Sequence, residues 1–384
     1  MISMNILLIS DNRYPDADAG AVREKVLADM LMQCGHNLYR VGRFCRKEKI
    51  IDNVVCISVP DNGKKRSGNI INLLLFNRNV MKMIRDSHKK YHYEAFLITG
   101  CKIRLVKAVK RFALRNHIKL VYNSVEYYSQ EQFKYGKLAR QFINNRIIAD
   151  KVIDKNFGVI GISSFLQEMF NARGIRSVRI PFVLSSDTVE CKLASNDRVE
   201  IAYVGRPSRR KDYLKDFIDA LAQLSGQELC RIHLTIVGVN MQQLKDNYFI
   251  SQETIDYLGS SLDAKGLVPR EEAMKILSGA DFTVLYRSDK EVYAKAGFPT
   301  KFCESMMSGV PMITNLTSDL GMYLVNEKNG LVISGKETIV ECYRKAINMS
   351  KAELYDMKLQ ARKTAEESLD STYYIDVLNS LFVN

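Results

Sequence analysis

Short apolar runs alternate along the chain with longer stretches that have the periodicity of a helix. Most of the short runs are continuously apolar, which is typical of strands buried on both faces of a parallel sheet. In 212–225, one of the longer stretches, apolar positions recur at spacings of three and four residues, as in an amphipathic helix. The alternation predicts an α/β fold with right-handed crossovers. The predicted strands are 5–10, 38–41, 95–99, 120–123, 159–162, 201–204, 232–237, 282–286, 311–314 and 331–333.

The chain has 384 residues, and at about 100–200 residues per domain two domains are expected. The break is predicted within 181–196, where IPFVLSSD leads into the polar CKLASND, and it divides the chain into domains 1–183 and 184–363. The last segment, 364–384, contains an amphipathic helix that can pack back on the N-terminal domain. We therefore predict two doubly wound, Rossmann-like domains facing across a cleft, because ligands of such sheets bind beyond the carboxyl ends of the strands.

Positive charge is concentrated in the N-terminal half. Residues 1–184 contain 32 Lys and Arg against 15 Asp and Glu, whereas the rest of the chain contains 24 against 28. The formal net charge is +13, and its uneven distribution indicates an anionic partner for the N-terminal half. Nucleic acid is not the expected partner, because the chain has no RNP, zinc-finger or helix-turn-helix signature.

The segment 101–119, CKIRLVKAVKRFALRNHIK, interleaves cations with apolar residues. One interpretation is a helix lying on an anionic membrane surface, where a lipid-linked acceptor would be met. The other is an ordinary surface helix with a buried apolar stripe. The cations are Lys102, Arg104, Lys107, Lys110, Arg111 and Arg115, and Lys64, Lys65 and Arg66 extend the charge.

The cysteines and the apolar segments bear on location. The eight cysteines form no C-x-x-C pair and are typical of buried free thiols in a reducing compartment. No segment reaches the roughly 18 apolar residues of a spanning helix, and the apolar residues 1–10 predict a strand rather than a signal peptide. We expect a cytoplasmic protein, with peripheral attachment to the inner face of the membrane as a hypothesis.

The first pattern with chemical meaning is IAYVGRPSRRKDYLKDFIDAL, residues 201–221. A buried strand ends at Val204, Gly205 makes a tight turn, and a helix is predicted to begin near Lys211. A helix N-terminus suits phosphate because it offers unpaired N–H groups and the positive end of a dipole. Arg206 and Lys211 add two positive charges beside it. The alternative is a turn with solvated basic residues.

The second pattern is AKAGFPTKFCESMMSGVPMIT, residues 294–314. A loop passes through Gly297, Phe298 and Pro299, Thr300 is the predicted N-cap of a helix, and the helix is predicted to end at Gly309. Glu304 lies in the early turns of this helix, where a carboxylate can accept hydrogen bonds from a ribose diol. Lys301 is close enough to pair with phosphate or with Glu304. The alternative is a capped helix with a surface Glu–Lys pair.

Taken together, the two patterns resemble the nucleotide-sugar domain of the family-4 retaining glycosyltransferases (glycosyl transferases group 1), which have the GT-B fold. The resemblance covers nearly the whole chain and is specific over 199–333. The family's Gly-Arg-then-Lys pattern is present as Gly205, Arg206 and Lys211. HLTIVGV matches the family's strand ending in a glycine, at Gly238, and KGLVPREEAMKILSGADFTVLY resembles the element that frames the base, with Gly266 and Val268 at the base edge.

The resemblance implies a function and a set of roles. Arg206 and Lys211 would hold the donor diphosphate and act in catalysis, Glu304 would hold the ribose, and the backbone of 297–300 would cradle phosphate and the donor sugar. The implied reaction moves a hexose from a nucleotide-diphosphate sugar, with uridine the expected base, to a glycan or lipid-linked acceptor in cell-surface polysaccharide or glycoconjugate biosynthesis. No cofactor or metal is implied, since the cations and the helix end neutralise the leaving diphosphate.

The N-terminal half resembles the family's acceptor domain less closely. Gly20 in DNRYPDADAG would approach the reaction centre as part of the donor site, and Gly35-His36 matches the turn after the first helix. Where the family often has a histidine, this chain has VYNSVEYYS, in which Glu126 is a candidate general base or a structural glutamate. Ser164 and Gln167 form a predicted helix cap.

Two departures leave alternatives open. The family often has a second glutamate eight positions before the ribose glutamate, and this chain has Ala296 there, which leaves the contacts to the donor sugar open. Asp16 and Asp18 form an Asp-x-Asp string of a kind that holds a metal in another glycosyltransferase fold, but it lies in the first loop and is not interpreted as a metal site. A non-catalytic sugar-nucleotide or polyanion binder remains the competing hypothesis. A dinucleotide-dependent dehydrogenase is disfavoured because no G-x-G-x-x-G follows the first strand.

Overall fold

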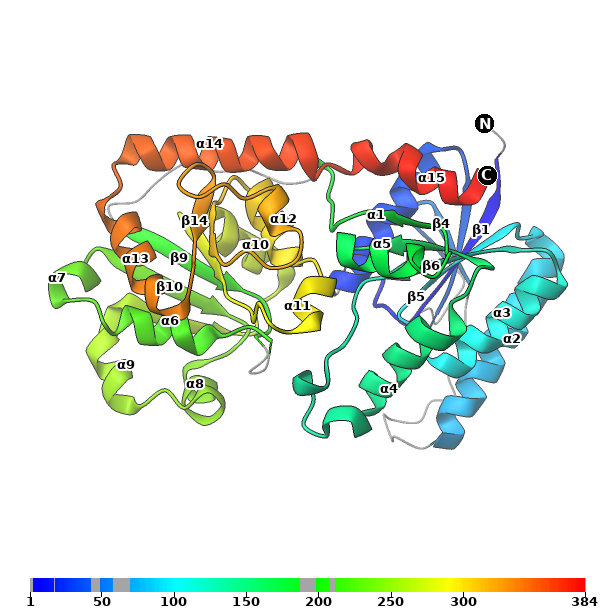
Figure 1. Ribbon diagram of the computed structural model, residues 1–384, viewed down its shortest axis with the longest axis horizontal. Coiled ribbons are helices and arrows are strands. Elements are labelled where there is room, and N and C mark those ends of the chain that lie inside the picture. The colour runs from blue at the N-terminus through cyan, green and yellow to red at the C-terminus, as the bar shows by residue number, and fades with distance from the viewer. Residues whose placement is uncertain are drawn as a thin grey trace. The chain divides into compact units, whose positions relative to one another are not determined.

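The computed structural model describes residues 3–16, 18–42, 49–57, 70–186, 198–207 and 211–383, with the backbone alone for 70–75. The chain forms two compact units (Figure 1). Unit 1 contains Met1–Val183 together with Ser371–Asn384, and unit 2 contains Leu184–Asp370. The sequence suggested that the second domain ends at 363, whereas residues 364–370 belong with unit 2.

In the described part of unit 1, eight strands form one sheet in the order β3-β4-β2-β1-β5-β6-β7-β8. Neighbouring strands pair in parallel except for β3 and β4, which are antiparallel. Strands β1 and β5 have the predicted bounds, but β3, β4 and β8 were not predicted, because runs of three or four residues show no clear pattern. The strands are β1 Asn5–Ser10, β2 Asn37–Gly42, β3 Lys49–Ile51, β4 Val54–Ile57, β5 Ala95–Thr99, β6 Lys119–Ser124, β7 Phe157–Gly161 and β8 Ser177–Arg179.

Helices cover this sheet, and the last of them comes from the far end of the chain. Leu378 and Phe382 of that helix, α15, join the core formed by Leu31 and the buried strand residues. His36 fixes the contact, since its Nε2 lies 2.8 Å from Asn379 Oδ1. The helices are α1 Ala19–Gln33, α2 Ile70–Tyr91, α3 Ile103–Arg115, α4 Arg140–Ile147, α5 Ser164–Asn171 and α15 Ile375–Val383, with short turns η1 Gln130–Gln132, η2 Gly136–Leu138, η3 Ile148–Val152 and η8 Ser371–Tyr374.

In the described part of unit 2, six parallel strands form a sheet in the order β11-β10-β9-β12-β13-β14. Chain order runs outward in both directions from β9 and β12, so the topological switch point lies between these two strands. The edge strand β11 was not predicted, because its sequence LDAKG mixes polar and apolar residues. The strands are β9 Val199–Val204, β10 Ile232–Val237, β11 Leu262–Gly266, β12 Phe282–Leu285, β13 Met312–Thr314 and β14 Gly330–Val332.

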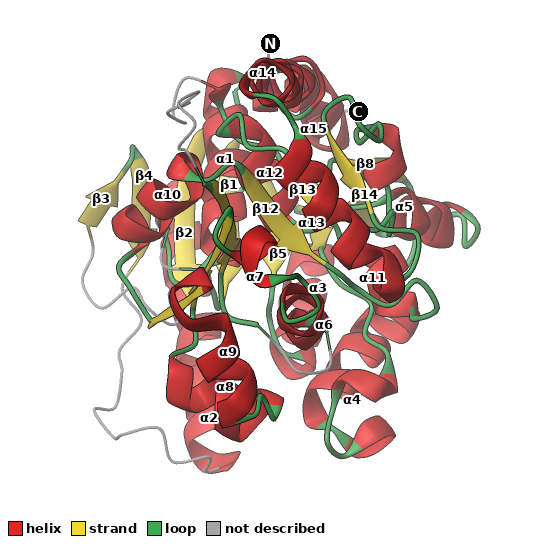
Figure 2. Ribbon diagram, turned by 90° about the vertical axis from the view of Figure 1, so that its left-hand side faces the viewer, coloured by secondary structure: helices red, strands yellow, loops and turns green. Residues whose placement is uncertain are grey.

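Helices flank the sheet of unit 2 as well (Figure 2). Phe217 and Tyr343 pack with Ile201 and Leu234 in the core on one face. The helices are α6 Leu214–Leu221, α7 Gly226–Leu229, α8 Met241–Tyr248, α9 Gln252–Leu258, α10 Arg270–Gly279, α11 Val292–Ala296, α12 Thr300–Met307, α13 Ile339–Asn348 and α14 Lys351–Ser368, with short turns η5 Gly259–Ser261, η6 Leu320–Met322 and η7 Lys336–Thr338.

Several predicted helix ends were wrong. Helix α6 begins at Leu214, after the uncapped Tyr213, and not near Lys211. The residue before α12 is Pro299 rather than Thr300, and α12 ends at Met307, with Gly309 in the left-handed region at φ +68°. The cap of α5 is the Ser163 side chain, which accepts from the N–H of Leu166 at 3.4 Å, so the predicted Ser164 cap lies one residue too far along.

The described cysteines carry no disulfide and are buried, apart from the exposed Cys230. Cys45 and Cys191 lie outside the described residues, as do Lys64, Lys65 and Arg66. Within the described ranges, no helix combines the length and the apolar character needed to cross a membrane.

Helix α14 is tied to the sheet of unit 2 by a buried ion pair. Lys358 Nζ lies 2.8 Å from Asp281 Oδ1, and both side chains are almost completely buried. The other carboxylate oxygen of Asp281 accepts the N–H of Glu200 at 3.0 Å. The pair therefore joins α14 to the start of β12 and to β9.

Lys358→Met should destabilise unit 2 by about 3–5 kcal/mol, because it leaves the Asp281 carboxylate buried without its cation. Urea unfolding followed by circular dichroism measures the change. Lys363→Met on the same helix is the matched control, since its ion pair with Glu367 is exposed and long at 3.8 Å; it should change the free energy of unfolding by less than about 0.5 kcal/mol. Equal stability of the two variants would contradict the prediction.

Candidate functional site

The loops that follow β9 and β12 bring together most of the residues singled out in the second half of the sequence. Both loops leave the carboxyl edge of the sheet at its switch point, where open α/β sheets bind their ligands. Gly205 follows β9, Gly238 follows β10 and Gly266 ends β11. The site is therefore built within unit 2, at the ends of adjacent strands.

Glycine is needed where these loops approach each other. Gly205 has φ +134°, and a Cβ there would lie 2.8 Å from Lys301 Cε. Gly238 has φ +108°, and its Cβ would lie 2.1 Å from the Gly205 carbonyl oxygen. The Gly238 N–H donates to the Gly266 carbonyl at 2.7 Å. Backbone therefore packs on backbone here, and the Lys301 side chain lies directly against Gly205.

A buried carboxylate, Asp212, organises the site. Its Oδ2 accepts from the Tyr203 hydroxyl at 2.8 Å and from Lys301 Nζ at 3.0 Å, and its Oδ1 accepts from Arg287 Nε at 2.9 Å. Lys301 Nζ also lies 4.9 Å from the centre of the Tyr203 ring, within range of a cation–π interaction. Asp212 is only 4% exposed, so its charge is compensated almost entirely by these three partners.

The surroundings shift the pKa values of this cluster. Burial raises the pKa of Asp212, but the nearby Lys301 and Arg287 more than offset burial and hold that pKa well below its ordinary value. Burial lowers the pKa of Lys301, and the Asp212 charge acts in the opposite direction. The carboxylate is therefore firmly ionised, and its charge opposes the net lowering of the Lys301 pKa.

The predicted phosphate cations lie on the loop between β9 and α6. Arg206 is exposed and Lys211 is half-buried; residues 208–210 between them lie outside the described part of the chain. Tyr293 donates its hydroxyl to the Lys211 carbonyl at 3.1 Å, and Tyr248 donates to the Pro207 carbonyl at 3.0 Å. Because α6 begins only at Leu214, the two cations belong to the loop and not to the first turn of the helix.

Glu304 and Lys301 do not pair with each other. Glu304 is 8% exposed and its Oε1 lies 2.8 Å from an Nη atom of Arg270, at the start of α10. Lys301 instead donates to the buried Asp212, at 3.0 Å. Val268 is half-buried in the short segment between Gly266 and Arg270, so the predicted base-edge residues lead directly to the residue that contacts Glu304.

The loop before α12 is packed on aromatic rings. Phe298 meets the Tyr323 ring edge to face at 5.7 Å between centroids. The Gly297 N–H donates to the Tyr293 carbonyl at 3.0 Å, so it is engaged within the protein and not directed at a ligand. The Pro299 carbonyl accepts the Phe302 N–H at 3.1 Å. Ala296, at the position of the family's second glutamate, is completely buried.

The two candidates in the N-terminal half belong to unit 1. Gly20 is the second residue of α1; its carbonyl accepts from Asn12 Nδ2 at 3.2 Å, and a Cβ would lie 2.7 Å from Asn12 Oδ1. Glu126 follows β6 and is half-buried. Its side chain hydrogen-bonds the Tyr128 side chain, and burial together with the Glu126 charge raises the pKa of that phenol. Glu126 is thus a held carboxylate at the carboxyl edge of its sheet.

Near Gly20, unit 1 has a buried ion pair that sequence analysis missed. Arg40 Nε lies 2.8 Å from Glu24 Oε1. The second oxygen of Glu24 accepts from the Ser10 hydroxyl at 2.5 Å and from Asn12 Nδ2 at 2.9 Å. This network fixes the loop that follows β1 and supports Gly20.

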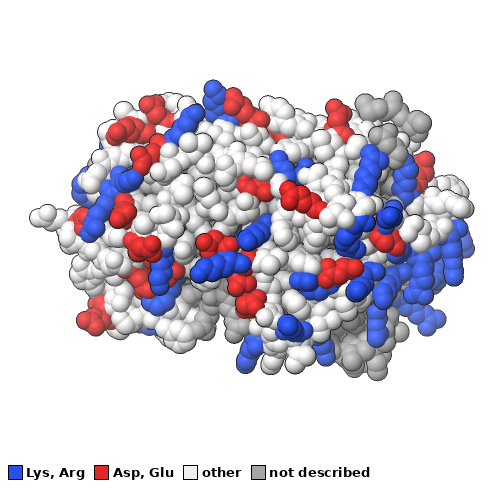
Figure 3. All heavy atoms as spheres, viewed as in Figure 1, with Lys and Arg blue, Asp and Glu red and all other residues white. Residues whose placement is uncertain are grey.

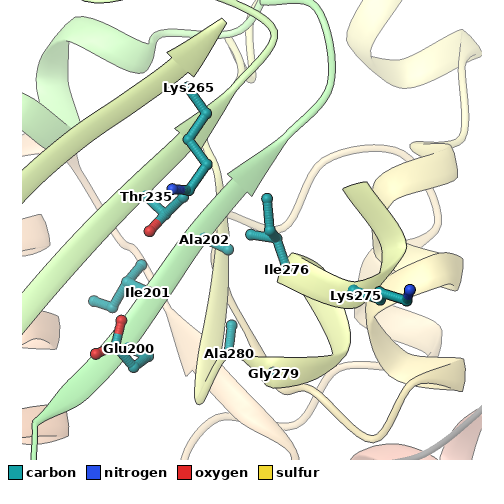
Figure 4. A pocket seen from close by; sticks show the side chains of 9 residues that line it. All are labelled: Glu200, Ile201, Ala202, Thr235, Lys265, Lys275, Ile276, Gly279 and Ala280. Carbon is teal, nitrogen blue, oxygen red and sulfur yellow. The ribbon is translucent and has the colours of Figure 1, made fainter. Parts of the chain in front are cut away.

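The structure also places the Asp-x-Asp string and shows a hollow away from the predicted site. Asp18 caps α1, accepting from the N–H of Ala21 at 2.9 Å, while residue 17 lies outside the described part. Among the described residues, no three His, Cys, Asp or Glu side chains are grouped closely enough to hold a metal ion. A hollow of about 220 Å³ lies over β9, β10 and β11 beside α10, between Glu200, Thr235, Lys265 and Ile276 (Figure 4). It contains none of the predicted site residues.

Sequence analysis missed Asp212, Arg287, Tyr203, Tyr293 and Arg270. Asp212 stands beside the recognised Lys211, so its position in the pattern was visible, but its burial was not. Tyr203 lies on β9 in the same pattern, but its contact with Asp212 was not visible there. Arg287, Tyr293 and Arg270 come from other strand ends and helices, and no local spacing points to them.

Comparison with known proteins agrees with this architecture. The sequence pattern of the glycosyl transferases group 1 family matches residues 188–364. No curated protein matches the chain in sequence. Sucrose-phosphate synthase from Thermosynechococcus elongatus has a similar structure, with a TM-score of 0.74 at 16% identity over 99% of this chain and 98% of that chain.

Two further solved structures have the same fold. HepE from Anabaena, in complex with UDP and glucose, has a TM-score of 0.67 at 14% identity over 98% of each chain. WaaG, a glycosyltransferase involved in lipopolysaccharide biosynthesis, has a TM-score of 0.68 at 14% identity over 99% of this chain and 100% of that chain. Residues 188–364 therefore match the glycosyl transferases group 1 family, and the fold shared along nearly the whole chain is the GT-B architecture.

Proposed function

We propose that the protein is a retaining glycosyltransferase of the hexosyltransferase type, which transfers a sugar from a UDP-sugar to a hydroxyl of a glycan or lipid-linked acceptor in cell-surface polysaccharide or glycoconjugate biosynthesis. The observation that carries the proposal is the cationic loop of unit 2. Gly205 brings the backbone against the Lys301 side chain, and Arg206 and Lys211 lie on the same loop. HepE, which shares the fold, was solved in complex with UDP and glucose, and this supports uridine as the base.

Diphosphate binding is the chemistry this loop is suited to. Arg206, Lys211 and Lys301 supply three positive charges that neutralise the leaving diphosphate without a metal ion. Glu304, held by Arg270, presents a carboxylate for the ribose hydroxyls. Gly266 and Val268 precede Arg270 and frame the base. These residues bind the diphosphate, the ribose and the base of the donor. The sugar that is transferred, with its anomeric carbon, stays free of these contacts and can meet the acceptor.

In the proposed reaction the acceptor oxygen bonds to the anomeric carbon as the bond to the diphosphate oxygen breaks. Attack from the face of the leaving group retains the configuration and needs no covalent enzyme intermediate. Glu126 in unit 1 takes or polarises the acceptor proton, and Gly20 leaves room at the first loop. The hydrogen bond from Tyr128 orients the Glu126 carboxylate for that role.

A non-catalytic sugar-nucleotide binder is the second candidate. Ala296, completely buried where the family often has a glutamate, favours it, because the sugar loses one polar contact. Release of UDP from UDP-glucose or UDP-galactose above a control without enzyme would eliminate this candidate, and its absence with every nucleotide sugar tested would favour it.

Arg206→Ala should weaken UDP binding by about 10–100-fold, because a hydrogen bond between charged groups contributes about 1.5–3 kcal/mol. Glu304→Gln should weaken uridine and UDP by a similar factor, since it removes the charge that receives the ribose. Isothermal titration calorimetry measures both. Lys215→Ala is the matched control: this exposed lysine on α6 pairs with Asp219, and its loss should leave binding unchanged. Wild-type affinity in both site variants would sink the donor-site assignment.

Membrane attachment is the second part of the proposal, and the basic face of unit 1 supports it. On α3 the apolar stripe Leu105, Val106, Val109 and Ala113 is buried in the protein, so this stripe is not available to lipid. Lys110 also turns inward, to Asp154 at 2.6 Å. The remaining charge is exposed on α2 and α3 (Figure 3). The exposed cations of this basic face are Arg78, Lys82, Arg85, Lys89, Lys90, Arg104, Lys107, Arg111 and Arg115.

Replacing Arg104, Lys107, Arg111 and Arg115 with Glu should abolish co-sedimentation with vesicles that contain phosphatidylglycerol. Each cation near an anionic surface contributes about 1 kcal/mol, so the loss should be at least about a hundredfold and the wild-type binding should fall with salt. The control replaces four exposed lysines of unit 2 with Glu: Lys275, Lys328, Lys345 and Lys363. Equal loss in both variants would show that net charge, and not the basic face, determines binding.

A further inference from the structure

Asp212 stands at the centre of a chain of contacts that reaches from β13 to α12. Asn315, which follows β13, holds the backbone of Arg287 through two hydrogen bonds, at 3.1 Å to its N–H and 2.7 Å to its carbonyl. Arg287 Nε binds one oxygen of Asp212, and Lys301 Nζ binds the other. The Tyr203 hydroxyl also donates to Asp212. Three donors therefore fix the orientation of the Asp212 carboxylate.

The two cations on Asp212 are unequally placed. Arg287 is anchored on both sides and its side chain is 8% exposed. The Lys301 side chain is 19% exposed, and its end lies against Gly205 in the phosphate loop. Lys301 is therefore the member of the cluster that a diphosphate on that loop can touch, while Arg287 lies behind it.

Without the carboxylate, the cluster would be unfavourable. Lys301 faces two cations, Arg287 from the β12 loop and Lys211 from the β9 loop, together with the Tyr203 ring from β9. Asp212 is the anion among these neighbours. It compensates one of the two buried charges, so the Asp212, Lys301 and Arg287 group keeps a net charge of +1 for a ligand anion.

We propose that Asp212, whose carboxylate Arg287 orients, is a positioning residue that holds the Lys301 side chain as an ammonium aimed at the diphosphate of the donor. The inference rests on the proposed function, and it deepens that function by naming the residues that prepare the cation. The carboxylate itself does not touch the donor; it acts through Lys301. Preorganised charge of this kind costs no rearrangement when the diphosphate arrives.

The test compares UDP with uridine at pH 7 and pH 9, by isothermal titration calorimetry, in wild type, Asp212→Asn, Lys301→Gln and the double variant. The phosphates of UDP keep their charge over this range, because the last phosphate pKa is about 6, and uridine measured at the same two pH values controls for ionisation of the uracil ring. In wild type, the affinity for UDP should change between the two pH values by no more than the affinity for uridine does. In Asp212→Asn, Lys301 loses the anion that kept it protonated, so UDP should bind at least about threefold more weakly at pH 9 than at pH 7, with tenfold per pH unit as the limit.

The double variant separates positioning from mere damage to the loop. In Lys301→Gln and in the double variant, UDP affinity should be reduced equally and should not depend on pH, because the group that titrates is gone. Uridine, which has no phosphate, should bind alike in all four proteins. Asp263→Asn is the matched control, since that aspartate pairs with Lys265 on β11, at 2.7 Å and exposed to solvent; it should behave as wild type.

Three outcomes would overturn the inference. The first is a pH-independent affinity for UDP in Asp212→Asn. The second is an additive loss, in which the double variant binds UDP more weakly than Lys301→Gln by the factor that separates Asp212→Asn from wild type. If Asp212→Asn does not fold, Arg287→Gln replaces it. Arg287→Gln should weaken UDP binding about tenfold in the wild-type background and should not change the UDP affinity of Lys301→Gln. The third contradicting outcome is an equal loss of UDP affinity in both backgrounds.

Failure of the proposed function gives a different result. A wild-type protein that binds none of UDP, GDP and ADP overturns both proposals together. A wild-type protein that binds UDP, with an Asp212→Asn variant indistinguishable from it, overturns only the positioning role.

Discussion

A single buried carboxylate connects the strand ends that make up the candidate site of unit 2. Removing Asp212 from water is unfavourable, and the fold offsets this only by bringing a lysine, an arginine and a tyrosine to its two oxygens. Those partners come from β9, from the loop after β12 and from α12. Because Lys211 directly precedes Asp212 and Gly205 lies against Lys301, the placement of the phosphate cations depends on this contact.

Unit 1 solves a similar problem with different residues. At the carboxyl end of its first strand, Glu24 is buried with Arg40, and Ser10 and Asn12 complete its hydrogen bonds. In each unit, a buried ion pair lies beneath the loop that follows a central strand and holds that loop in place. The loop carries or contacts a glycine, which is Gly20 in unit 1 and Gly205 in unit 2. Buried pairs of this kind add little net stability compared with apolar packing; what they provide here is a defined position for polar groups.

The sequence predicted the long buried strands well, because a continuous apolar run of five or six residues has few other interpretations. Strands β3, β8 and β11 escaped notice because they are short or carry polar residues at an edge.

The partners of side chains were harder to predict than the secondary-structure elements. Lys301 and Glu304 are three residues apart on one helix, and local spacing left Glu304 and a phosphate as the two candidate partners of Lys301. The actual partners, Asp212 and Arg270, arrive from other strand ends, and only the folded sheet brings them into reach. Likewise, the amphipathic pattern of α3 identified a buried stripe and a basic face, but it did not tell which face meets a partner.

The position of α15 has a consequence for how the protein is made. Unit 1 is built from residues at both ends of the sequence, and Leu378 and Phe382 complete its core. During synthesis, therefore, unit 2 emerges whole from the ribosome while the unit before it still lacks a helix. The usual order, in which the N-terminal domain finishes first, is reversed: unit 1 keeps an open apolar surface until α15, which follows unit 2 in the chain, has been made. The surface left open includes the sheet around Gly158, against which Leu381 packs in the finished fold.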